Sequence, residues 1–436
     1  MLPSNRDIVV IGGGIVGTAC ALNLQRAGFS VVLIDRGVPE SAASFGNAGH
    51  FAYEQVFPLA GPWVWKQLPR LLLARNSPLS IPPASLFTLG TWLARFAWNT
   101  RPSQVQRASV ALASLLGPAR EAWRRLAAEA HVQGLLRTSQ ILVVARNDEA
   151  LRTKRPLMAE FRKHGIVVQE VDGHRARSIE PALREGIAGA FVYHHAQYTV
   201  DPGALTAGLA NACRGAGVDV QQGTIDSLEV LGDGRIAVGV DARRWTAGQC
   251  VVAAGIGSRE VLKRAGFDVP LAAERGYHLM VPYNDRRSPV RVPVIGASPE
   301  FVITPMASGL RLAGTVEIAR PDRPPNWHRA RMLKGLAEEL IGPLEVAVDA
   351  PMWMGCRPTL PDSLPVIGRL PGAPAIIAAF GHQHLGLTLA AITGELVASI
   401  AGGEPASIDL APFAIERFGA SRSASRSSRA DATTRE

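Results

Sequence analysis

Continuous runs of apolar residues near the start of the chain give the clearest secondary-structure pattern in the sequence. The run DIVVIG, residues 7–12, is continuously apolar after its first residue, and a second such run, VVLID, follows at residues 31–35. Between them, residues 18–28 form a helix-like segment that ends at Gly28, a residue that commonly stops helices. Continuously apolar strands are typical of parallel sheets that are buried on both faces, so the pattern predicts a strand, a helix and a second, parallel strand.

Similar segments recur further along the chain. QILVVAR at residues 140–146 predicts a strand, and a helix-like segment at residues 203–217 leads into the strand-like residues 218–230. The runs CVVAAGIGS, residues 250–258, and AIIAAFGHQHLGLT, residues 375–388, each join an apolar stretch to glycines and a helix-like segment. This alternation predicts an α/β fold in which one doubly wound, Rossmann-like domain is built from separated segments.

The separated segments leave room for a second domain of mixed α+β character. We assign residues 1–50, 145–258 and 350–418 to the doubly wound domain, and residues 51–144 and 259–349 to the inserted domain. The ligand crevice of the first domain should face the inserted one. The last segment, residues 419–436, is rich in Ser and Arg and is predicted to be a disordered tail.

The first strand-to-helix junction carries a glycine motif. Gly12, Gly14 and Gly17 form GxGxxG directly between the predicted strand and helix, and Asp35 ends the next strand. The three glycines allow a tight turn, close approach of the backbone to a pyrophosphate, and close packing of helix on strand. Asp35 can accept hydrogen bonds from a ribose, and its charge would repel a 2′-phosphate. The motif predicts binding of FAD or NAD and disfavours NADP.

Composition narrows the class of protein. The four cysteines are widely spaced and form no CxxC or Cys/His pattern, which argues against a disulfide framework and a zinc site and favours a reducing, cytoplasmic location. We expect no metal, because the two histidines of the GHQH run do not by themselves make a metal site. We find no nucleic-acid-binding motif among the basic residues.

The net charge of +9 is unevenly distributed. Residues 61–125 contain nine Lys and Arg and one acid, Glu121. Two interpretations remain open: a peripheral contact with an anionic membrane, at the inner face of the cell membrane, or a helical subdomain with a solvated basic face. The same segment holds half of the chain's 8 tryptophans, namely Trp63, Trp65, Trp92 and Trp98.

Six motifs occur along the chain in this order: VVIGGGIVGTACALNLQRAGFSVVLID, SAASFGNAG, VVAAGIGS, ERGYHLMV, GCRPTLPDSLPVIG and GHQHLGLT. With these motifs the chain, from about residue 7 to about residue 418, resembles the FAD-dependent amine and amino-acid oxidoreductases related to D-amino acid oxidase, and within them the bacterial D-amino acid dehydrogenases. The resemblance implies an FAD-binding domain and a substrate domain. It also implies noncovalent FAD, because Cys356 is one residue out of register with the cysteine that tethers flavin in some amine oxidases.

The resemblance also implies which residues meet the cofactor. The glycine junction at residues 381–388 would lie beside the pyrimidine end of the flavin, where backbone N–H groups can stabilise negative charge on the reduced ring. The implied cofactor-binding residues are Gly12, Gly14, Gly17, Asp35, Arg36, Ser44, Asn47, Gly49, Gly255, Ser258, Gly381, His382, Gly386 and Thr388.

Three further residues are implied to act on the substrate. Arg357 is expected to bind a carboxylate with its planar fork, although a structural arginine would satisfy the same chemistry. Tyr277 and His278 are expected to line the substrate cavity, and a plain strand aromatic is the alternative for Tyr277. The implied reaction is oxidative deamination of a D-amino acid, including D-proline or hydroxy-D-proline types, with hydride transfer to flavin N5 and hydrolysis of the imine to a 2-oxo acid.

The electron acceptor is left open by these residues. The basic, Trp-rich segment would suit delivery of electrons to a membrane quinone, which favours a dehydrogenase that also reduces dyes. The rivals are a glycine or sarcosine-type amine oxidase that uses oxygen, and a flavin electron-relay subunit without a substrate. A relay has no carboxylate to hold, so Arg357 argues against it. Neither the particular D-amino acid nor the oligomeric state follows from the sequence.

Overall fold

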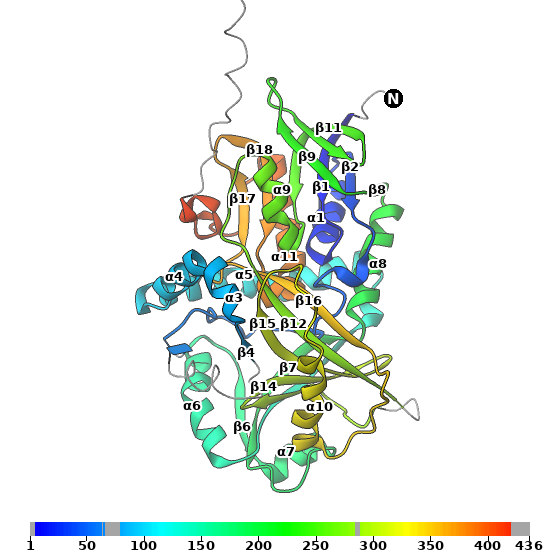
Figure 1. Cartoon of the computed structure of the whole chain (residues 1–436). Coiled ribbons are helices and arrows are strands. Elements are labelled where there is room, and N and C mark those ends of the chain that lie inside the picture. The colour runs from blue at the N-terminus through cyan, green and yellow to red at the C-terminus, as the bar shows by residue number, and fades with distance from the viewer. Residues whose placement is uncertain (1–4, 63, 66–78, 284–287, 420–436) are drawn as a thin grey trace, which may run out of the picture.

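The computed structural model describes residues 5–62, 64–65, 79–283 and 288–419 of the 436-residue chain. It contains two large sheets, one above the other in Figure 1, with helices packed against their outer faces. Except for Gly419, the expected disordered tail lies outside the described residues, and so does Trp63.

Within the described residues the first sheet has eight strands, and its centre is parallel. The order is β17-β18-β11-β1-β2-β8, with β10 on β11 and β9 on β10, both antiparallel. The N-terminal and C-terminal parts of the chain therefore meet in one sheet (Figure 1). The strands are β1 (Asn5–Ile11), β2 (Val31–Asp35), β8 (Asp219–Gln222), β9 (Ile225–Val230), β10 (Ile236–Val240), β11 (Arg243–Val252), β17 (Val366–Leu370) and β18 (Ala373–Phe380).

Helices cover both faces of this sheet, which explains why β1 is apolar throughout. Ile8 and Val10 join the core beneath α1 (Ile15–Arg26), α5 (Pro102–Glu129), α8 (Pro202–Gly215) and α11 (Gly386–Gly402). Val9 and Ile11 join the opposite core with α9 (Ser258–Arg264). Both the predicted strand-helix-strand unit and the doubly wound α/β class are thereby confirmed.

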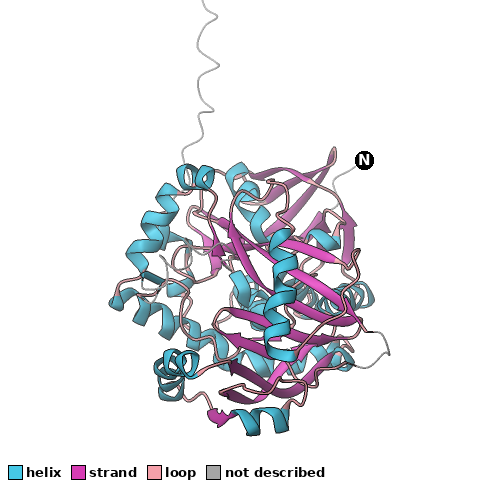
Figure 2. Cartoon of the chain, turned by 60° about the horizontal axis from the view of Figure 1, so that its bottom comes forward, coloured by secondary structure: helices cyan, strands magenta, loops and turns pink. Residues whose placement is uncertain are grey.

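In the part of the chain that the structure describes, the second sheet has ten mixed strands in the order β16-β12-β15-β14-β13-β5-β7-β3, with β4 on β15 and β6 on β7. Its outer face is covered by α10 (His328–Ile341) and α7 (Gly173–Ile179), and Figure 2 shows helices outside these strands. The strands are β3 (His50–Phe51), β4 (Leu79–Ser80), β5 (Leu136–Ala145), β6 (Val168–Asp172), β7 (Gly189–Thr199), β12 (Ala272–Pro282), β13 (Val294–Ala297), β14 (Glu300–Met306), β15 (Gly309–Ile318) and β16 (Met352–Thr359).

The sheets divide the chain differently from the segments that we assigned. Strands β6 and β7 fall within residues 145–258 and β16 falls within residues 350–418, yet all three pair in the second sheet. The strand predicted at residues 140–146 is confirmed as β5, and it too belongs to the second sheet. Apolar runs predict strands, but the hydrogen-bond partner of each strand depends on contacts with distant segments.

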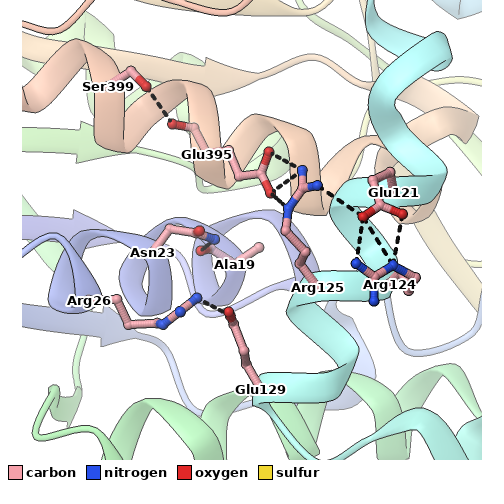
Figure 3. Close-up of polar contacts among 9 residues, drawn as sticks. All are labelled: Ala19, Asn23, Arg26, Glu121, Arg124, Arg125, Glu129, Glu395 and Ser399. Carbon is pink, nitrogen blue, oxygen red and sulfur yellow. Dashed lines mark hydrogen bonds and ion pairs between the residues drawn. The ribbon is translucent and has the colours of Figure 1, made fainter.

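A buried tryptophan holds helix α5 against α11, and ion pairs, which Figure 3 shows, join α5 to α1 and α11. Trp123 is fully buried and donates from Nε1 to the carbonyl oxygen of Leu387 at 2.9 Å. On the surface, Arg125 makes two 3.0 Å bonds to Glu395, and Arg26 pairs with Glu129. Exposed pairs of this kind contribute at most about 1 kcal/mol each, so apolar packing does most to hold these helices together.

The basic, Trp-rich segment is less uniform than its composition suggests. Trp92, on α4 (Gly90–Asn99), is buried, whereas Trp65 and Trp98 are 48% and 54% exposed. Arg101 lies 3.5 Å over the Trp98 ring, and Arg125 is neutralised by Glu395. Membrane contact stays a prediction, and the described residues that carry it are the two exposed tryptophans and the arginines beside them.

The remaining helices are α3 (Pro83–Thr88), in the same segment, and α6 (Asp148–Lys163), further along the chain.

One described helix, residues 383–402, is long and apolar enough to cross a membrane, with a mean hydropathy of 1.6. However, 67% of this segment is buried, and α11 packs against α1 and α5. These contacts are those of a core helix.

We predict opposite effects for two helical glycines. A Cβ on Gly17 would lie 1.8 Å from the carbonyl oxygen of Gly12, so Gly17→Ala should push α1 off β1 and lower the free energy of unfolding by about 1–3 kcal/mol. A Cβ on Gly335, in α10, meets nothing within 4 Å, so Gly335→Ala should stabilise by about 0.5–1 kcal/mol. Denaturant unfolding of the two variants checks both signs, and a neutral Gly17→Ala would contradict the packing described here.

Candidate active site

A cavity of about 510 Å³ lies where the first sheet meets the second. The segments that follow β1, β2, β11 and β18 line one side of it, and β12, β15 and β16 line the other. The carboxyl ends of parallel strands meet at one edge of a sheet, and this is where ligands bind in open α/β folds. The volume is within the usual range of a small-molecule site.

Ten of the fourteen expected cofactor residues line this cavity, and four lie behind its wall. Those behind the wall are Gly17, Gly49, Ser258 and Thr388. Thr388, for example, is fully buried, and its hydroxyl accepts the N–H of Ala52 at 2.9 Å. The ten lining residues are Gly12, Gly14, Asp35, Arg36, Ser44, Asn47, Gly255, Gly381, His382 and Gly386.

The glycine loop has the geometry that its motif predicts. Gly12 has a φ of +107°, and a Cβ there would lie 2.6 Å from the carbonyl oxygen of Ala253. Gly14 is the N-cap of α1, and the N–H of Ile15 points to Ser44 Oγ at 3.0 Å. Gly14, Ile15 and Val16 line the cavity, so the positive end of the α1 dipole faces it, which suits a diphosphate.

Asp35 ends β2 beside this loop. One carboxylate oxygen accepts the N–H of Gly13 at 2.7 Å and the other accepts the N–H of Gly37 at 2.9 Å. These two bonds fix the side chain at the cavity and leave lone pairs on both oxygens. The position is compatible with the expected contact to a ribose.

Arg357 enters the cavity from the second sheet. It lies on β16 directly opposite Glu274 on β12, and its Nη1 donates to Glu274 Oε1 at 2.6 Å. The other oxygen of Glu274 accepts the hydroxyl of Thr359 at 3.1 Å. The guanidinium lies over Gly276, where a Cβ would come within 2.7 Å of Nη2.

This arrangement leaves one edge of the guanidinium available. Glu274 is 8% exposed and does not line the cavity, whereas the Arg357 side chain is 26% exposed and does. The ion pair compensates the arginine charge and holds the fork by Nη1, so that Nε and Nη2 can face a ligand. Our sequence analysis did not identify Glu274 or Gly276, although alternation along ERGYH places residues 274, 276 and 278 on one face.

Tyr277 points to the opposite face of β12. Its hydroxyl donates to Glu317 at 2.7 Å and accepts the N–H of Asn326 at 3.1 Å, next to a fully buried ion pair between Arg275 and Glu317. Burial raises the pKa of Tyr277 to about 12. Tyr277 touches the cavity wall, but this placement does not support a hydroxyl that donates to a substrate. The geometry matches the alternative, a strand aromatic.

His278 faces the Arg357 side but does not line the cavity. Its Nδ1 donates to the carbonyl oxygen of Gly46 at 2.8 Å, and its ring stacks on Trp353 with the centroids 5.2 Å apart. Burial, with a smaller effect of Arg311, lowers the pKa of His278 to about 3. His278 therefore supports the loop that carries Ser44 and Asn47, as a neutral packing group.

The histidines of the GHQH run also differ in their surroundings. His382 bonds Thr393 Oγ1 at 3.0 Å, and burial lowers its pKa to about 3. His384 lines the cavity near Glu274 and Arg357, and burial lowers its pKa to about 4. No group of three or more potential ligands that could hold a metal ion is found among the described residues.

Comparisons with known proteins bear on this site. Residues 7–400 match the model of a family described as FAD dependent oxidoreductase. The chain is 34% identical over 431 residues to a D-amino-acid oxidase of Bradyrhizobium diazoefficiens, covering 96% of this chain and 100% of that protein. The chain belongs to this FAD-dependent oxidoreductase family.

Solved structures agree on the fold. Glycine oxidase from Geobacillus kaustophilus superposes with a TM-score of 0.73 at 22% identity, covering 95% of this chain and 99% of that one. L-proline dehydrogenase from P. horikoshii superposes with a TM-score of 0.71 at 18% identity, covering 96% and 99%. The two domains of this family, an FAD domain and a mixed substrate sheet, are thus those described above.

The residues present fit FAD. The start of α1 suits the diphosphate of FAD, and Asp35 suits a ribose. Both lie at one end of the cavity, which extends from there to Arg357. At that other end, Gln383 is 6% exposed, and neither atom of its amide has a hydrogen-bond partner among the described residues. A buried amide without partners is costly, so its presence indicates a polar ligand there.

The buried histidines predict a loss of stability in acid. The folded pKa of His278 lies below that of the unfolded chain, so between pH about 6.5 and about 3 the unfolded state binds more protons and stability falls as the pH falls. In His278→Asn the amide can still donate to Gly46 but does not titrate. The variant should show a shallower decline of the free energy of unfolding between pH 6.5 and 4.5, by at most about 1.4 kcal/mol per pH unit. His174→Asn, at an exposed site, is the control. If stability fell equally steeply with pH in the unaltered protein and in both variants, His278 would not be a source of the loss of stability in acid.

Proposed function

We propose that this protein catalyses the FAD-dependent oxidative deamination of a D-amino acid to an imine, which hydrolyses to a 2-oxo acid. The observation that carries the proposal is the position of Arg357, whose partly exposed guanidinium lines the same cavity as the dinucleotide loop. The D-configuration is supported by the 34% identity to a D-amino-acid oxidase over nearly the whole of both chains. Glycine and L-proline enzymes share the fold, so the fold alone does not set stereochemistry.

In this proposal the chain holds the adenosine diphosphate part of FAD at one end of the cavity. Backbone N–H groups at the start of α1 bind the diphosphate, and Asp35 binds the adenosine ribose. When bound, FAD supplies a two-electron acceptor for the hydrogen on the substrate Cα. In this proposal the cofactor is noncovalent: Cys356 borders the cavity, but alternation along β16 turns its side chain away from Arg357, toward Arg275 and Glu317.

Arg357 binds and orients the substrate. Its free edge donates two parallel hydrogen bonds to the carboxylate, a charge-assisted contact that contributes about 1.5–3 kcal/mol. Because the guanidinium is held against Gly276 and is planar, the carboxylate is held in one orientation, and this limits which face of Cα meets the ring. A flavin electron-relay subunit would have no use for such an arginine.

His384 is placed to meet the amine. It lines the cavity near Arg357, and because burial lowers its pKa to about 4 the imidazole is neutral at pH 7. A neutral ring adds no second positive charge beside the arginine and keeps a lone pair that can accept an N–H of the substrate. Carboxylate and amine then have separate partners on β16 and on the loop after β18.

Electrons leave, in our proposal, to a quinone or another acceptor rather than to oxygen. Support comes from the exposed Trp65 and Trp98, with Arg101 stacked on Trp98, which suit contact with an anionic membrane at the inner face of the cell membrane. The oxygen-dependent glycine or sarcosine-type oxidase is the competing function, and the name of the Bradyrhizobium relative favours oxygen.

A panel of amino acids tests the function and the acceptor together. We expect D-amino acids to bleach the bound flavin under anaerobic conditions and their L-enantiomers to leave it yellow. With a D-amino acid present, a dye acceptor should be reduced rapidly and little oxygen consumed. Rapid peroxide formation without added acceptor would reject the dehydrogenase, and bleaching by glycine or L-amino acids alone would reject the proposed substrate class.

Variants of Arg357 and of its partner test the carboxylate site. Arg357→Leu should raise the KM for the amino acid by about 10- to 150-fold, since it removes a charge-assisted pair, while FAD stays bound. Glu274→Ala should raise KM by about tenfold, because Arg357 loses the contact that holds it over Gly276, and Glu274→Gln should restore most of the affinity. The measurements are steady-state kinetics and the absorbance of bound flavin.

A similar ion pair outside the cavity provides the control. Asp362 and Arg417 are 2.6 Å apart and 12% and 16% exposed, compared with 11% and 26% for Glu274 and Arg357. Asp362→Asn should cost comparable stability and leave KM unchanged. If Arg357→Leu left KM unchanged, the proposed binding role of Arg357 would be wrong.

A further inference from the structure

Gln383 is a buried polar residue that neither the glycine motif nor the proposed substrate contacts explain. It begins the one-turn helix η4 (Gln383–Leu385) after β18 and lines the cavity. The side chain is 6% exposed, and its Oε1 and Nε2 are without hydrogen-bond partners among the residues that the structure describes. An unpaired buried polar group costs about 1–3 kcal/mol, so such an amide is retained where a ligand completes it.

The backbone at this residue is also unusual. Gln383 has a φ of +52°, in the left-handed region that non-glycine residues seldom adopt. Gly381, two residues earlier, has a φ of +83° and is the residue type expected for such a bend. Strained backbone of this kind is concentrated at ligand-binding positions, where it aims a side chain. The two features together indicate that the Gln383 amide is directed at a ligand.

The position of Gln383 identifies which part of the ligand it meets. At the edge of the first sheet the strands follow in the order β2, β1, β11, β18, so Asp35 after β2 and Gln383 after β18 stand at opposite ends. If the adenosine ribose lies at Asp35 and the diphosphate at the start of α1, the flavin ring lies toward β18. Helix η4 also packs against β16, which carries Arg357, and a substrate bound there must reach the ring.

We propose that the Gln383 side chain binds the pyrimidine edge of the flavin. That edge presents an N–H group between two carbonyl oxygens, and a carboxamide offers an acceptor and a donor side by side. Oε1 accepts the ring N–H, and Nε2 donates to a neighbouring ring carbonyl. Both atoms that are unpaired in the protein alone are then satisfied, and the ring is fixed in register with Arg357. This inference depends on FAD binding and not on the identity of the substrate.

Three variants of the full chain separate this role from a structural one. Gln383→Met keeps the length of the side chain and removes the amide, and Gln383→Glu keeps the acceptors but removes the donor. Leu387→Met, at another buried position that lines the cavity, changes shape without removing a polar group. The measurements are the FAD dissociation constant, by titration of deflavinated protein, and the melting temperature with and without FAD.

We expect Gln383→Met to weaken FAD binding by about tenfold and Gln383→Glu to weaken it further, because a carboxylate opposes the ring carbonyls. The melting temperature of the FAD-free Gln383→Met chain should be unchanged or higher, since an unpaired amide has been removed, and the rise in melting temperature on adding FAD should be smaller. Leu387→Met should match the unaltered protein in FAD affinity.

Three results would overturn the proposal, and each has a separate meaning. If the FAD dissociation constant of Gln383→Met were unchanged, the amide would make no contact with FAD, and its partner would be a bound water or no group at all. A normal FAD constant with weaker binding of a carboxylate ligand would assign the amide to the substrate. A lower melting temperature of the FAD-free variant, with an unchanged response to FAD, would show a packing role. Failure of the unaltered chain to bind FAD would instead remove the cofactor assignment itself.

Discussion

The chemistry of the cavity depends on the antiparallel pairing of β12 with β16. This register sets Glu274 directly opposite Arg357 on the face that looks toward the first sheet. An arginine at a largely buried position is costly unless its charge is compensated, and Glu274 compensates it from behind without entering the cavity. A shift of one residue in this register would turn Arg357 to the outer face.

The same strand carries a second buried ion pair on its other face. Arg275 and Glu317 are fully buried and paired directly, and the hydroxyl of Tyr277 donates to Glu317. The two pairs have similar chemistry and different surroundings. Arg357 keeps part of its guanidinium exposed, and the carboxylate that holds it lies outside the cavity, as a binding group requires. Arg275 is fully buried and, among the described residues, bonds only groups of the protein, namely Glu317 on β15 and the carbonyl oxygen of Arg323.

The first sheet contributes backbone groups to the cavity, and the second sheet contributes the charged side chain of Arg357. Its two glycine junctions, Gly12 after β1 and Gly381 after β18, open at the same edge although they are far apart in the chain. The first approaches the strand end so closely that a side chain would collide with Ala253. The second is followed by Gln383 and the start of α11. A dinucleotide that lies along this edge would meet a helix start at both junctions, and such sites favour negative charge.

Local patterns were enough to predict the secondary structure near the sites and part of the cofactor residues. The apolar runs of β1 and β2, the helix between them and the role of the glycines depend on neighbouring residues, and the structure has them where the sequence predicts them. Arg357 was recognised from a resemblance, and alternation along β12 could also have revealed Glu274 and Gly276 as its neighbours on one face.

Other properties are set by contacts between distant segments, and the sequence does not display these. The residues of β6, β7 and β16 do not show which sheet these strands join, and only their hydrogen-bond partners place them in the second. The partners of the Tyr277 hydroxyl, Glu317 and Asn326, lie 40 or more residues away. Gln383 is inconspicuous in the sequence, because its left-handed backbone and its unpaired amide arise only when β18, η4 and β16 are packed together.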